Sequence, residues 1–186
     1  NMTDLLLIGG ATPEMLERLG AAFTVHRLSD AADPVSWLAE HGAKIHYVAT
    51  NGHDGVKPDY IKALPNLKLI SCYGVGYDAI DTNLARAGGI MITHTPNVLN
   101  AEVASTALML MLACYRNLLA DDAYVRSGDW ETRGNAPLSR SADDQVVGIV
   151  GLGRIGQAIA DKLAPFNATI LYLSLIHISE PTRHSI

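Results

Sequence analysis

The sequence has no excess of positive charge. Its 186 residues include 14 Lys and Arg against 19 Asp and Glu, which gives a formal net charge of −5. A nucleic-acid-binding protein needs a basic face to neutralise phosphates, so we expect no nucleic-acid partner. Hydrophobic residues make up 48% and charged residues 18% of the chain, a mixture that excludes collagen-like, coiled-coil and disordered classes.

Cysteine is also scarce. Cys72 and Cys114 are the only two, and both lie within apolar stretches. Such a pair predicts buried, reduced thiols rather than a disulfide framework. We therefore expect a cytoplasmic protein, and we expect no metal site.

Long hydrophobic runs are missing as well. The longest, residues 103–115, is bounded by Glu102 and Arg116 and is too short to cross a bilayer. The residues at the N-terminus have no basic segment and too short an apolar run for a signal peptide. We expect no membrane partner.

Strand and helix patterns alternate along the first half of the chain. Short apolar runs predict strands over residues 5–8, 23–28, 45–50, 67–72 and 90–93, with helices over 12–19, 33–42, 60–64 and 82–87. This alternation predicts an α/β fold, a flavodoxin-like or doubly wound parallel sheet covered on both faces. Because ligands of such sheets bind at the carboxyl ends of the strands, the loops 50–55 and 73–78 should meet at one rim.

A boundary follows at Thr95-Pro96-Asn97. Beyond it, one long apolar helix is predicted from Glu102 to about Arg126, with more apolar residues than one intramolecular face needs. That surplus predicts a homodimer. Residues 131–144 are polar and contain Gly and Pro, which predicts a surface connection. A second βαβ pattern then runs to residue 172, with strands over 146–150 and 168–172.

The second half contains the pattern G-x-G-x-x-G over residues 151–156, which follows an apolar strand and opens an amphipathic helix. In that context it predicts a dinucleotide-binding loop. Gly151 allows the tight turn, Gly153 lets the backbone approach a pyrophosphate, and Gly156 lets the helix pack on the strand. The helix N-terminus offers free N–H groups to phosphates, and Arg154 can add a charge. A merely structural glycine turn is the alternative.

The first half has a glycine cluster of its own, Gly74-Val75-Gly76. Successive N–H groups of a glycine-rich turn can bind an anion such as a small carboxylate. A tight strand–helix turn that needs positive φ explains the same residues equally well.

Three segments together carry a family resemblance. Residues 73–81 (YGVGYDAID) look like the substrate loop of the D-isomer-specific 2-hydroxyacid dehydrogenases, and residues 95–104 (TPNVLNAEVA) resemble the segment that leads into their inter-domain helix. Residues 148–157 (GIVGLGRIGQ) are similar to their dinucleotide loop. Within the family, the sequence looks closest to bacterial glyoxylate/hydroxypyruvate reductases. The resemblance covers residues 2–172.

The resemblance implies a fold, a reaction and a set of site residues. Residues 1–98 would be a flavodoxin-like substrate domain, and 99–172 the inter-domain helix with the first βαβ unit of a Rossmann domain that binds NADP or NAD. The reaction would be hydride transfer between NAD(P)H and a small 2-keto acid. The substrate carboxylate would be held by the amides of Val75 and Gly76, with help from Asn51. The residues expected at the cofactor are Gly151, Gly153, Arg154, Ile155, Gly156 and, near the nicotinamide, Val103.

The family's catalytic Arg, Glu and His have no matching positions in this chain, so the resemblance implies that the chain alone is inactive. Residues 173–186 do not continue a Rossmann unit and resemble translated adapter sequence, which predicts a non-native tail; a divergent natural tail is the alternative. Two other functions stay open. An NAD(H)-sensing corepressor can share this fold, and a free-standing flavodoxin-like module could end at Thr95.

Overall fold

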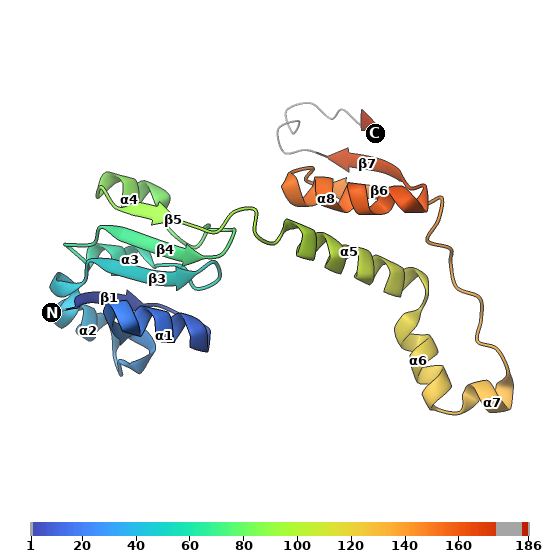
Figure 1. Cartoon of the computed structure of the whole chain (residues 1–186), viewed down its shortest axis with the longest axis horizontal. Coiled ribbons are helices and arrows are strands. Elements are labelled where there is room, and N and C mark those ends of the chain that lie inside the picture. The colour runs from blue at the N-terminus through green and yellow to red at the C-terminus, as the bar shows by residue number, and fades with distance from the viewer. Residues whose placement is uncertain (1, 174–183, 186) are drawn as a thin grey trace. The chain divides into compact units, whose positions relative to one another are not determined.

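The computed structural model describes residues 2–173 and 184–185. The chain divides into two compact units, Asn1–Pro96 and Asn97–Ile186 (Figure 1). The predicted tail falls largely outside the described residues, apart from Leu173, which ends a strand, and a short strand over His184–Ser185.

The first unit is a five-stranded parallel sheet with helices on both faces. Its strands are β1 (Thr3–Leu7), β2 (Phe23–Arg27), β3 (Tyr47–Asn51), β4 (Leu69–Tyr73) and β5 (Met91–Thr93). Its helices are α1 (Pro13–Ala22), α2 (Pro34–His41), α3 (Pro58–Lys62) and α4 (Thr82–Ala87), with 3₁₀ turns at Leu28–Asp30 and Gly42–Lys44. The strand order β2-β1-β3-β4-β5 is that of flavodoxin-like folds, as predicted.

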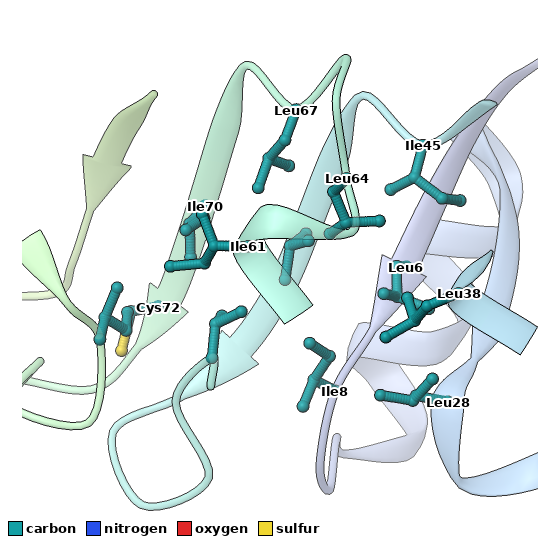
Figure 2. Close-up of a cluster of buried hydrophobic side chains, with 13 residues drawn as sticks. Leu6, Ile8, Leu28, Leu38, Ile45, Ile61, Leu64, Leu67, Ile70 and Cys72 are labelled. Atoms are coloured by element: carbon teal, nitrogen blue, oxygen red, sulfur yellow. The ribbon is translucent and has the colours of Figure 1, made fainter. Parts of the chain in front are cut away.

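The main core of this unit lies on one face of the sheet (Figure 2). Leu6, Ile70 and Leu38 are almost fully buried there, and α2 and α3 contribute to the same cluster. A smaller cluster on the opposite face contains Leu5 and Leu7 of β1 with side chains of α1 around them. Since successive side chains of a strand point to opposite faces, the apolar run Leu5–Ile8 supplies both clusters, as expected for a strand buried on both sides.

The start of α1 follows the predicted cap, but its end does not. Thr12 Oγ1 accepts a hydrogen bond from the N–H of Met15 at 3.2 Å, and Pro13 is the first helical residue. The helix was expected to stop at Gly20, yet it continues to Ala22. Gly20 is exposed and does not adopt positive φ, so it is an ordinary helical residue rather than a cap.

The second unit has three helices before its sheet. They are α5 (Asn100–Tyr115), α6 (Leu118–Arg126) and α7 (Asp129–Arg133), followed by β6 (Val146–Val150), α8 (Arg154–Leu163), a 3₁₀ turn at Ala164–Phe166, β7 (Thr169–Leu173) and β8 (His184–Ser185). Strands β6 and β7 are parallel, and β8 pairs antiparallel with β7. Leu108 and Met111 of α5 pack on a core formed by Ile149, Leu163 and Ile170.

Two predictions about this unit are wrong. The single helix over 102–126 is two helices that meet at 58°, because Asn117 adopts left-handed backbone angles, with φ of 52° (Figure 1). Cys114, expected to be buried, is exposed, whereas Cys72 is buried as predicted; both are free thiols. An apolar sequence around the whole of α5 does not say which side is packed, and Cys114 lies on a side that is not.

Among the described residues, no single helix has both the length and the hydropathy of a membrane span. Helices α5 and α6 meet that criterion only when they are taken together across their bend.

Candidate functional site

The loops after β1, β3 and β4 meet at one edge of the first sheet, as expected from its parallel strands. The strand register pairs Asn51 with Tyr73, which brings the residues that follow these two side by side. A Cβ built on Gly52 would lie 2.7 Å from the carbonyl oxygen of Gly76, and one built on Gly74 would lie 3.0 Å from the nitrogen of Gly52. The two loops therefore touch through their backbones, and a side chain at either glycine would push them apart.

The sequence left two explanations of the Gly74-Val75-Gly76 cluster, an anion-binding turn and a tight turn that needs positive φ. Neither Gly74 nor Gly76 has positive φ, so the turn does not need glycine for that reason. The absence of a Cβ at Gly74 matters because of the contact with Gly52. The anion-binding hypothesis further requires that N–H groups of this turn have no hydrogen-bond partner within the protein.

The N–H groups of Val75 and Gly76 have no hydrogen-bond partner among the residues that the structure describes. The carbonyl groups around them do have partners. The Gly74 carbonyl accepts from the N–H of Thr95 at 2.9 Å, and the Val75 carbonyl bonds to Nδ1 of His94 at 2.9 Å. Two adjacent N–H donors at the rim are thus open to a ligand, while hydrogen bonds from Thr95 and His94 fix the carbonyl groups of the same peptide units.

The buried side chain of Cys72 contacts the same loop. Its Sγ lies 3.6 Å from the Gly76 carbonyl oxygen. Burial raises the pKa of the Cys72 thiol, so the group is protonated near neutral pH and donates this weak hydrogen bond. The buried cysteine is a packing and positioning group, and no acidic or basic side chain among the described residues is paired with it.

Asn51 shapes its own loop. Its Oδ1 accepts from the N–H groups of His53 at 2.9 Å and Asp54 at 2.8 Å. Its Nδ2 donates to Asp54 Oδ2 at 2.6 Å and approaches the Gly10 carbonyl at 3.4 Å. Both polar atoms of the side chain are in use, so contact between Asn51 and a substrate stays a prediction.

The second unit has the predicted strand–turn–helix context around its glycine pattern. Gly151 follows β6 with φ of 94°, a conformation that favours glycine, and Gly153 is the N-cap of α8. A Cβ at Gly156 would collide with the Gly151 carbonyl oxygen, so the helix approaches the loop as closely as the pattern requires. Nothing in the described chain lies within 4 Å of a Cβ at Gly153, which leaves its backbone open.

Three further predicted residues lie in this unit. Arg154 and Ile155 form the first turn of α8, and Arg154 is exposed without an acidic partner in the described chain. Val103 lies near the start of α5 and is 38% exposed. The free N–H groups of the first turn of α8 suit a phosphate. The contacts of these residues with a cofactor stay predictions.

Sequence reasoning gave no role to two residues of this rim, Gly52 and His94, although the loop at residues 50–55 was expected there. No local sequence signal singles out Gly52, because its contact with Gly74 exists only in the strand register that pairs Asn51 with Tyr73. His94 follows β5, the next strand in the sheet, and so belongs to the same edge. In the described part of the chain, no three His, Cys, Asp or Glu side chains come together as a metal site would need.

Comparisons with known proteins agree with this geometry. A sequence model described as the catalytic domain of D-isomer-specific 2-hydroxyacid dehydrogenases matches residues 5–175. The 2-ketogluconate reductase of Gluconobacter oxydans is 38% identical over 181 residues, which cover 97% of this chain and 57% of the relative. The chain spans a little over half the length of the curated relatives that match nearly all of it.

Solved structures show the same relationship. A 2-hydroxyacid dehydrogenase from Ketogulonicigenium vulgare superposes with a TM-score of 0.86 at 43% identity, over 91% of this chain and 54% of that one. An NADPH-dependent glyoxylate/hydroxypyruvate reductase from Sinorhizobium meliloti, in complex with NADP and malonate, gives 0.81 at 36% identity, over 92% and 53%.

These names favour the enzyme over the NAD(H)-sensing corepressor, and the second unit contradicts a module that ends at Thr95. With an open pair of N–H groups at the rim of a flavodoxin-like sheet, a glycine loop that opens α8, and a family match over residues 5–175, the chain belongs to the D-isomer-specific 2-hydroxyacid dehydrogenase family.

Proposed function

We propose that the protein to which this chain belongs reduces a small 2-keto acid to a D-2-hydroxy acid with NADPH or NADH. Glyoxylate and hydroxypyruvate are the proposed substrates. The observation that carries the proposal is the pair of N–H groups of Val75 and Gly76, which have no partner in the described part of the chain and suit a carboxylate. The Sinorhizobium neighbour, a glyoxylate/hydroxypyruvate reductase, supports the substrate class.

The glycine loop of the second unit is the proposed cofactor site. Its residues fit a dinucleotide, because Gly153 leaves its backbone open and α8 presents free N–H groups at its N-terminus. Gly153, Arg154 and Ile155 would contact the pyrophosphate, and Val103 would lie beside the nicotinamide. Gly151 and Gly156 belong to the same site because they allow the tight turn and the close packing of α8. The cofactor supplies the hydride, while the protein supplies orientation and electrostatic stabilisation.

The role of the first unit in the reaction is to bind and orient. Two N–H groups that point at one carboxylate fix both its position and the direction of the adjoining keto group. The proton for the carbonyl oxygen has no donor in the motifs of this chain that match the family. We therefore propose that the Arg, Glu and His of the family lie in a part of the protein outside this chain, that the chain alone is inactive, and that residues 173–186 are foreign to it.

The proposed assembly is a homodimer in the cytoplasm. Met109 and Leu110 of α5 and Leu118 and Leu119 of α6 are large apolar side chains that are more than half exposed. Such an exposed set is typical of a surface that a second copy covers. The free thiols of Cys72 and Cys114 suit a reducing compartment.

The experiment that tests this function starts from the DNA beyond codon 172. The complete gene product, once purified, is expected to oxidise NADPH or NADH when glyoxylate or hydroxypyruvate is added, and the 186-residue chain is expected to show no turnover. Robust turnover by the short chain would contradict the proposal that the proton donor lies outside it. No turnover by either would contradict the proposed reaction.

A further inference from the structure

We propose that His94 is a positioning residue for the carboxylate-binding loop, because it fixes the peptide group that presents the N–H of Gly76. The inference rests on the proposed function, since it concerns how the two donors of the Gly74–Tyr77 loop are held for a carboxylate. His94 contacts the loop at the Val75 carbonyl, and we assign it no contact with the substrate.

The geometry of the peptide bond makes the link. A peptide group is planar, and in the trans form its C=O and N–H point in opposite directions. The carbonyl of Val75 and the N–H of Gly76 belong to one peptide group, which is trans like every other peptide bond in the described residues. A hydrogen bond from Nδ1 of His94 to the Val75 carbonyl at 2.9 Å therefore turns the Gly76 N–H away from His94 and toward the open rim.

The neighbouring donor is held in the same way by the backbone. The N–H of Val75 shares its peptide group with the carbonyl of Gly74, which accepts from the N–H of Thr95 at 2.9 Å. His94 and Thr95 follow directly after β5, so the end of one strand holds both peptide groups. The contact made by Thr95 is a backbone contact, whereas the one made by His94 depends on its side chain and can be removed.

The ring of His94 is itself held in place. It packs against the ring of Tyr77 with centroids 4.8 Å apart and planes at 72°, an edge-to-face arrangement. Because a carbonyl oxygen can only accept, Nδ1 of His94 must carry the proton in this bond. The structure thus requires the Nδ1–H tautomer whenever the ring is neutral, which is a property that can be measured directly.

Two substitutions separate the hydrogen bond from the packing. His94→Phe keeps a ring against Tyr77 but removes the donor, whereas His94→Asn keeps an N–H donor near the position of Nδ1 but removes the ring. His46→Phe is a matched control, because Nδ1 of His46 also bonds to a backbone carbonyl, that of Lys44 at 3.0 Å, away from the loop.

The test is a titration of the ¹⁵N-labelled 186-residue chain with oxamate, an analogue of a 2-keto acid, followed at the amide signals of Val75 and Gly76. Releasing one peptide group to rotate should raise the Kd about tenfold in His94→Phe. His94→Asn should recover most of that loss, and His46→Phe should bind within about twofold of the wild type. The wild-type ring nitrogens should show protonation on Nδ1 in the neutral form.

The outcomes separate the inference from the function on which it rests. Oxamate shifts in the wild type with an unchanged Kd in His94→Phe would overturn the role of His94 alone. No shift at Val75 or Gly76 in the wild type would overturn the carboxylate site and this inference together. A neutral ring protonated only on Nε2 would overturn the inference without any variant, which covers the case of a variant that fails to fold.

Discussion

A single methyl group at Gly52 should weaken carboxylate binding by the neighbouring Gly74–Tyr77 loop. In Gly52→Ala the new Cβ would lie 2.7 Å from the Gly76 carbonyl oxygen, while contacts of a real Cβ are rarely closer than 3.0–3.4 Å. The oxygen belongs to backbone and cannot rotate aside, so the loops must separate by about 0.3–0.7 Å. That movement displaces the N–H groups that we propose as the carboxylate donors.

The expected size of the effect follows from the strength of such bonds. A hydrogen bond to a charged group contributes about 1.5–3 kcal/mol, and a misplaced donor keeps only part of it. A loss of about 1–2 kcal/mol corresponds to a Kd that is roughly five to thirty times larger. Global stability should change little, because Gly52 does not adopt positive φ and Gly→Ala also lowers the entropy of the unfolded chain.

Gly10→Ala is the matched control. Gly10 lies at the same rim after β1, also has no positive φ, and a Cβ there would meet nothing within 4 Å. The assay is the oxamate titration followed by ¹H–¹⁵N spectra, with unfolding in urea to compare stability. An unchanged Kd in Gly52→Ala would refute the reasoning, as would an equal loss in Gly10→Ala.

Three further predictions concern stability and assembly. Gly156→Ala should destabilise the second unit by about 1–3 kcal/mol in urea unfolding, because its Cβ collides with the Gly151 carbonyl oxygen; Gly148→Ala, which meets nothing within 4 Å, is the control, and equal stability of both would contradict the close packing of α8. The His26 hydrogen bond at 2.5 Å holds the pKa of Asp4 below its ordinary value, so this contribution to the free energy of unfolding is present above about pH 4 and is lost as the pH falls through the lower folded pKa. Asp4→Asn should be less stable than wild type at pH 6 but lose less stability between pH 6 and 3, and parallel pH curves would show that the pair contributes nothing. In the complete protein, Leu119→Asp should convert the proposed dimer into a monomer, as measured by light scattering, because Leu119 is 83% exposed. A variant that stays dimeric would show that Leu119 does not lie in the dimer interface.

The sheet of the first unit could be predicted from sequence because each strand is a short apolar run bounded by turn residues. The loop at residues 151–156 could also be predicted, because a positive φ at Gly151 and the close packing at Gly156 both require glycine. Local patterns of this kind depend on backbone sterics within a few residues.

The features that escaped prediction depend on pairings between distant segments. The contact of Gly52 with Gly74 exists only in the register that pairs Asn51 with Tyr73. The break between α5 and α6 comes just after the apolar run 103–115, where a single left-handed residue, Asn117, changes the helix direction before the apolar pattern resumes at Leu118. The exposure of Cys114 depends on which side of an apolar helix is packed, and that is a tertiary property.

The most direct test of the proposed reaction is the chirality of the product that the complete protein makes from hydroxypyruvate and NADPH. A carboxylate held by the N–H groups of Val75 and Gly76 presents one face of the keto group to the hydride, so a single enantiomer should form. The account predicts D-glycerate together with stoichiometric oxidation of NADPH. Formation of L-glycerate or of a racemic mixture, or no oxidation of either nicotinamide cofactor, would contradict it.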